Sequence, residues 1–196
     1  MLGLVKALKQ SMTSLVLNQS RLYAVLLSIT TLLGCANRNE MYASPPDELI
    51  QQVSALLPLA EEYVLSNEKE ALENGIPLNS YQLVIARKIG LKNPEKVRIY
   101  YVNQLPFPSD PTLAALAMKT GYGSPKTAYT FGYGVWILSS AKGDQVVVAH
   151  EFVHVRQAEE MGLSEQIKQY LMQLFIYGYD QAPMEIEAYS EEKKYF

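Results

Sequence analysis

The sequence Gln145-Val-Val-Val-Ala-His-Glu-Phe-Val-His154 decides how the rest of this chain is interpreted. Asp144 can cap the helix that this stretch begins, and Met161-Gly162 can end it. Its apolar side chains form a broad face, which is typical of a helix buried at the centre of a domain. The stretch also contains both histidines of the chain, His150 and His154. We therefore expect a buried helix that carries the two histidines on one side.

The histidine spacing predicts a metal site, because residues four apart lie one turn apart on the same helix face. Glu151 is turned about 100° away from His150, so its carboxylate can reach a water on the ion without competing easily for the ion itself. Zinc lowers the pKa of such a water to about 7, and the carboxylate takes its proton during attack on a carbonyl. We expect one zinc ion on His150 and His154, with Glu151 as the general base.

A catalytic zinc ion needs a third protein ligand and an open fourth position. With Cys35 assigned to a lipid anchor (below), no other histidine or cysteine remains, so the ligand must be a carboxylate. A linking helix and turn over 165–180, followed by a final helix that starts at Pro183, would bring the chain back beside the motif helix. The candidates are Glu185 and Glu187, which lie about 200° apart on that helix, so only one can face the metal.

Two motifs together resemble the gluzincin metallopeptidases: His-Glu-Phe-Val-His at 150–154 and Glu-Ile-Glu-Ala-Tyr at 185–189. The resemblance covers residues 127–192. It implies an α+β, mostly helical, zincin-like domain with a small sheet, in which a bent edge strand over 127–138 precedes the motif helix. It also implies that this strand binds an extended peptide substrate by adding it to the sheet edge.

The resemblance gives two answers for the third ligand. In prenyl-protease-like members the ligand precedes an alanine by three residues, which favours Glu185, although Tyr189 stands where those enzymes have an aspartate. In thermolysin-like members the ligand directly precedes the alanine and an acidic residue follows four later, which favours Glu187 with Glu191. We prefer Glu185 and keep Glu187 as the alternative.

The oxyanion formed during hydrolysis needs a hydrogen-bond donor besides the metal. Tyrosine often fills that role in such enzymes, which makes Tyr179 and Tyr189 the candidates, with Tyr177 also close in sequence. The chain has 14 tyrosines, so packing is the alternative role for each of them. We expect the remaining acidic residues of the C-terminal tail to lie on a solvated helix face.

We expect the middle of the chain to have a structural role. Its patterns predict a helix from Asp47 to about Asn74, a helix over Ser80–Ile89, a strand over Val97–Val102, a loop over Leu105–Pro111 and a short helix over Thr112–Lys119. Residues 47–196 are thus expected to form one domain.

The N-terminus resembles a bacterial lipoprotein signal. An uncharged run of 12 residues, 22–33, is too short to cross a bilayer as a helix but suits the apolar region of a secretory signal. It ends in Leu-Leu-Gly-Cys35, similar to a lipobox, so residues 1–34 are the expected signal peptide, with Met1 or Met12 as the start. Residues 35–46 then form a flexible tether, and lipidated Cys35 attaches the protein to the membrane, by resemblance the outer membrane facing the periplasm.

Composition restricts the function classes. The chain has 196 residues, 48% of them hydrophobic, which is enough to bury a core in one domain. A net charge of −3 with scattered basic residues argues against a nucleic-acid partner. We therefore expect a membrane-anchored zinc metallopeptidase of the cell envelope that acts on a peptide or protein. The alternatives are a non-enzymatic envelope lipoprotein with a structural or vestigial zinc site, and a binding module whose motif is accidental.

Overall fold

The computed structural model describes residues 37–124 and 126–195, so the expected signal peptide and Cys35 lie outside the described residues. By its internal contacts the chain divides into two units, 1–43 and 44–196. The described part of the first unit contains one short helix, α2 (Arg38–Ala43).

Helix α2 lies within the segment 35–46, which we expected to be a flexible tether, and none of its residues is buried. The side chain of Asn37 accepts a hydrogen bond from the backbone N–H of Asn39 at 3.1 Å, and its carbonyl accepts one from Met41 at 3.0 Å. Asparagine is a strong N-cap residue, so Asn37 starts this helical turn.

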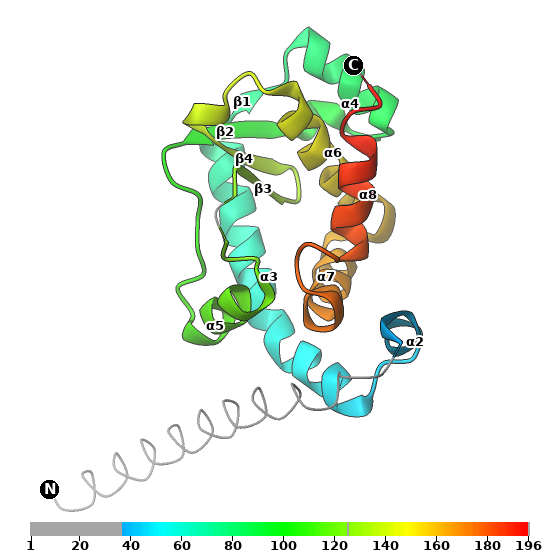
Figure 1. Cartoon of the computed structure of the whole chain (residues 1–196). Helices are drawn as coiled ribbons and strands as arrows, with labels where there is room; N and C mark the ends of the chain where they lie inside the picture. The colour runs from blue at the N-terminus through cyan, green and yellow to red at the C-terminus, as the bar shows by residue number, and fades with distance from the viewer. Residues whose placement is uncertain (1–36, 125, 196) are drawn as a thin grey trace, which may run out of the picture. The chain divides into compact units, whose positions relative to one another are not determined.

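The second unit is mostly helical with one small sheet, which confirms the α+β class (Figure 1). Within the described residues, no helix has both the length and the apolar composition needed to cross a membrane. In chain order the elements of the second unit are α3 (Asp47–Asn74), β1 (Ile76–Pro77), α4 (Ser80–Ile89), η2 (Pro94–Lys96), β2 (Arg98–Val102), α5 (Pro111–Thr120), β3 (Ala128–Phe131), β4 (Gly134–Leu138), η3 (Ser139–Ala141), α6 (Gln145–Met161), α7 (Leu163–Tyr177) and α8 (Pro183–Glu191).

The four strands are arranged in the order β1-β2-β4-β3. Strand β2 runs parallel to β4, while β1 pairs antiparallel with β2 and β3 pairs antiparallel with β4. The sheet is therefore mixed, and β3 forms one of its edges.

The segment 127–138 is a β-hairpin rather than the single bent strand that we expected. Phe131 pairs with Gly134, which leaves Gly132 and Tyr133 as a two-residue loop. Gly132 has φ +57°, in the left-handed region that side chains disfavour. Glycine at the first loop position is typical of a tight hairpin. The glycine that we expected to bend one strand thus separates two.

Both faces of the sheet are covered by helices (Figure 1). Ile99 and Val135 pack on one face with residues of α4 and α6, while Trp136 packs on the other face against α3. Side chains alternate along a strand, so in β3 Tyr129 belongs to the α3 side and Thr130 to the α6 side, where it contacts Glu151. The edge strand is thus held directly against the motif helix.

Candidate metal centre

Helix α6 begins and ends as the sequence predicts. The Asp144 carboxylate accepts hydrogen bonds from the backbone N–H groups of Val146 and Val147 at 2.9 and 3.2 Å, which caps the first turn. The N–H of Gly162 closes the last turn by donating to Ala158. Between these ends the helix buries a continuous apolar surface: Val148, Ala149, Phe152, Val153 and Val155. This packing fixes the helix, and with it the direction of its polar side.

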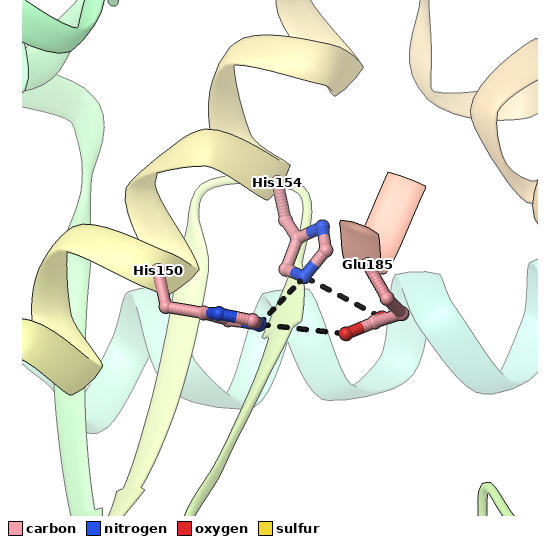
Figure 2. Close-up of side chains that lie close together, drawn as sticks. All are labelled: His150, His154 and Glu185. Carbon is pink, nitrogen blue, oxygen red and sulfur yellow. Dashed lines mark hydrogen bonds and ion pairs between the residues drawn. The ribbon is translucent and has the colours of Figure 1, made fainter. Parts of the chain in front are cut away.

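Three side chains from α6 and α8 converge on one point, as Figure 2 shows. The Nε2 atoms of His150 and His154 are 3.3 Å apart. Glu185 places Oε2 at 3.4 Å from Nε2 of His150 and Oε1 at 3.5 Å from Nε2 of His154. Ligands held tetrahedrally at about 2.0–2.2 Å from a metal ion lie about 3.4 Å from one another. The group therefore has the spacing of a metal site, and it could hold a metal ion.

Glu187, the alternative third ligand, points elsewhere. Its carboxylate pairs with Arg156 and accepts a hydrogen bond from Nε2 of Gln157 at 2.8 Å. Helix α8 begins with Pro183 and docks so that Glu185 faces the histidines, where it is 2% exposed. Of the two candidates, only Glu185 belongs to the cluster.

Two outer partners determine which nitrogen of each histidine carries the proton. Nδ1 of His150 lies 3.1 Å from a carboxylate oxygen of Glu192, which can only accept, so Nδ1 of His150 is the donor. Nε2 of Gln157 donates to the carbonyl of Met184 at 3.1 Å, which turns Oε1 of Gln157 toward Nδ1 of His154 at 2.9 Å. Nδ1 of His154 therefore donates as well, and the Nε2 atoms of both rings face the centre, where each can bind a metal ion when it carries no proton.

The centre thus brings acceptor atoms close together, and a cation between them would stabilise this arrangement. Oε2 of Glu185 is buried and makes no hydrogen bond, although buried carboxylate oxygens usually find a partner. Burial would lower the pKa of His154, but the charge of Glu185 outweighs it and raises that pKa to about 9. Burial would raise the pKa of Glu185, but His154 and the other partners hold it well below its usual range. A shared proton can thus fill the place that a metal ion fits.

Glu151 lies beside this group at a cavity. Its Oε2 accepts a hydrogen bond from Oγ1 of Thr130 on β3 at 2.7 Å. Burial raises the pKa of Glu151, an effect that His150, His154 and the Thr130 hydrogen bond partly offset. Glu151, His154 and Glu185 all line one cavity of about 130 Å³ that is partly open to solvent. A base and two of the three candidate ligands therefore face the same space.

The structure places the two expected oxyanion donors differently. Tyr179 is buried, lines the cavity and interacts with the Glu185 carboxylate. Tyr189 is about half exposed, and its ring centroid lies 4.6 Å from that of His150. Tyr177 is the last residue of α7. Tyr170, which we did not single out, donates to Oε1 of Glu185 at 2.6 Å.

The acidic tail is solvated only in part, because the side chain of Glu187 is 43% exposed and that of Glu191 only 17%. Arg156 on α6 is largely buried and pairs with both Glu187 and Glu191. Glu192 pairs with His150, and its side chain is only 14% exposed. We expected one glutamate of this run to face the histidines, but the sequence contained no sign that Arg156 would pair with two others.

Sequence reasoning missed four residues that contact the candidate site: Thr130, Gln157, Tyr170 and Glu192. Gln157 follows His154 by three residues, so helix spacing could have identified it as a neighbour of that ring. The other three reach the site only through the tertiary fold.

No family model, curated protein or solved structure matches this chain. Conclusions about the site therefore rest on the arrangement of its own residues.

Proposed function

We propose that the chain is a zinc metallopeptidase, anchored to the bacterial cell envelope through Cys35. The observation that carries this proposal is the convergence of His150, His154 and Glu185 next to a cavity that Glu151 also lines.

The donor set favours zinc among the common divalent ions. Two neutral imidazole nitrogens and one carboxylate oxygen form a set that catalytic zinc sites use, and such sites keep a fourth position open. Calcium and magnesium prefer oxygen ligands only. When bound, the ion supplies Lewis acidity toward a substrate carbonyl and makes a water molecule easier to deprotonate.

The protein's own residues supply the proton chemistry. Glu151 takes the proton of the attacking water and later delivers it to the leaving amine. Thr130 holds one Glu151 oxygen, so the other remains available toward the cavity. Burial raises the pKa of Glu151, which brings this carboxylate closer to the pKa that proton transfer near neutral pH requires.

The first test is metal content. The purified full-length chain, handled without chelator, is expected to contain about one zinc per chain by elemental analysis, whereas the His154→Ala variant is expected to contain almost none. If neither protein takes up zinc when it is resupplied, the proposal is wrong.

A second variant separates a peptidase from a lipoprotein with a structural zinc. Glu151→Gln keeps the candidate ligands and removes the base, so it should retain zinc while its turnover rate falls by about 100- to 10,000-fold.

The full-length protein also tests the lipid anchor. Metabolic labelling with a fatty acid should label the wild type and should not label Cys35→Ala.

A further inference from the structure

The cavity beside the candidate metal centre extends well beyond the catalytic residues. Its walls come from α3, α5, β3, α6, α7 and α8. Apart from His154, Glu151 and Glu185, the cavity is lined by aliphatic and aromatic side chains with few polar ones, and by no lysine or arginine. A cavity of about 130 Å³ is large enough for a substantial side chain.

The aromatic wall contains five tyrosines, which at first suggests a polar surface. Three of them use their hydroxyls on one another or on the backbone. Tyr63 donates to the carbonyl of Pro106 at 3.1 Å, and Tyr129 donates to the carbonyl of Tyr122 at 2.9 Å. The hydroxyl of Tyr122 is hydrogen-bonded to that of Tyr63. These residues therefore offer the cavity mainly ring surface.

The other two tyrosines are engaged at the metal-centre end. Tyr170 donates to Glu185 at 2.6 Å, and Tyr179 also interacts with that carboxylate. The two other polar groups of the wall are occupied too, because Thr130 donates to Glu151 and the amide nitrogen of Gln166 donates to the carbonyl of His154. Despite its tyrosines, the wall has apolar chemistry.

The position of the cavity relates it to the edge strand. Tyr129 and Phe131 of β3 line it, and β3 pairs only with β4 within the described residues. A peptide that added to this edge would run past Glu151 with alternate side chains directed to one face. One of these side chains would then enter the cavity.

We infer that this cavity is a specificity pocket that binds a large apolar side chain, aromatic or branched aliphatic, of a peptide substrate adjacent to the bond that is cleaved. The inference rests on the proposed function and names its substrate class. A charged side chain of either sign would lose its hydration in this cavity. The wall has no lysine or arginine to pair with an acidic side chain, and its two carboxylates, Glu151 and Glu185, are engaged at the metal centre in the proposed function.

The first experiment measures binding without turnover. The full-length, zinc-loaded Glu151→Gln variant is titrated by calorimetry with two hydroxamates, which chelate zinc and differ only in a benzyl or a methyl side chain. Burial of the ring predicts at least about tenfold tighter binding of the benzyl compound. Equal binding of the two compounds would overturn the inference.

Filling the cavity should remove this preference. Ala60 on α3 and Ala117 on α5 line the cavity from two different helices. Ala60→Leu and Ala117→Leu, each added to the Glu151→Gln background, should reduce the benzyl preference, and either one suffices if the other does not fold. Ala55→Leu makes the same change at an exposed position of α3 and should keep the preference. If neither folded filling variant alters the preference, the ring binds elsewhere and the inference fails.

A cleavage assay distinguishes failure of this inference from failure of the proposed function. Zinc-loaded wild type is given peptides that differ at one residue, either phenylalanine, alanine or lysine. Preferred cleavage next to phenylalanine supports both proposals. Cleavage without preference overturns the pocket and leaves the peptidase. Absence of cleavage, with the benzyl preference intact, refutes the peptidase but leaves an apolar pocket at a metal site.

Discussion

Gln157 connects the candidate metal centre to the helix that supplies the third ligand, and replacing it tests this connection. The side chain is 1% exposed and makes three hydrogen bonds: with Nδ1 of His154, the carbonyl of Met184 and the carboxylate of Glu187. Gln157→Leu keeps an apolar body of similar size but removes all three hydrogen bonds. The His154 ring should therefore be held less firmly in its orientation, and α8 should pack less stably against α6.

The structure allows both effects to be estimated. Loss of an outer partner of a metal-bound histidine lowers metal affinity about 10- to 100-fold, which corresponds to about 1.4–2.8 kcal/mol. For folding, a buried Nδ1–H of His154 without an acceptor costs about 1–3 kcal/mol, and the two other hydrogen bonds contribute about 1 kcal/mol each. We expect the metal-free variant to lose about 3–5 kcal/mol of unfolding free energy.

Gln173→Leu is the matched control. Gln173 is also buried, at 3% exposed, and its Oε1 accepts from the backbone N–H of the same residue, Met184, at 3.0 Å. Its replacement should lower the unfolding free energy by about 1–3 kcal/mol, whereas the Nδ1 atoms of His150 and His154 keep their own partners, Glu192 and Gln157. Zinc affinity is measured by competition with a chromophoric chelator, and stability by urea unfolding.

The two variants should differ in zinc affinity by at least about tenfold. The reasoning fails if folded Gln157→Leu binds zinc as tightly as wild type, because the hydrogen bond to His154 would then have no effect on the ligand. It also fails if Gln173→Leu weakens zinc binding equally, because general destabilisation would then explain both results.

Three further predictions follow from the same geometry. Glu185→Gln should reduce zinc affinity more than the 10- to 100-fold expected for an outer partner, whereas Glu187→Gln should reduce it less; chelator competition compares them. In metal-free protein the pKa of His154 is raised from 6.5 to about 9. The protonated ring therefore contributes fully to the unfolding free energy below pH 6.5, and this contribution is lost as the pH rises through 9. Urea unfolding should show this trend in the wild type and not in His154→Gln. Gly132→Ala should cost more than the left-handed strain of about 1–2 kcal/mol, because the new Cβ displaces the Glu68 carboxylate, which accepts a hydrogen bond from the backbone N–H of Tyr133. Gly143→Ala, also at positive φ but with open space around it, should show the strain alone by the same measurement.

The parts of the site that were predictable depend on local spacing. A helix places His150, Glu151 and His154 by its own geometry, so their mutual arrangement follows from the sequence once the helix is recognised. The phase of α8 likewise allows only one of Glu185 and Glu187 to face the centre. Which of the two does so depends on how α8 docks, and sequence spacing contains no information on that.

The fold was predictable to a similar depth. Glycine and capping residues gave the helix ends closely, as for α4, which begins after the Asn79 cap and ends at Gly90 with φ +105°. The hairpin was missed because the run 127–138 has strand composition throughout, and its two loop residues are a glycine and a tyrosine rather than a polar turn pair. Its strands pair with each other and β4 pairs with β2, a long-range contact that no local pattern shows.

The contacts between α6 and α8 explain how Glu185, which is 31 residues after His154 in the sequence (185 − 154), comes to lie beside the two histidines. Arg156 on α6 forms ion pairs with Glu187 and Glu191 on α8, and these ion pairs hold the two helices together. The histidines add contacts of their own, because each directs Nδ1 outward to a polar group and Nε2 inward. These contacts are made by protein atoms, and they hold the three candidate ligands within reach of one another. A metal ion that bound there would have little ordering to do, so more of its binding free energy would appear as affinity and as added stability of the folded state.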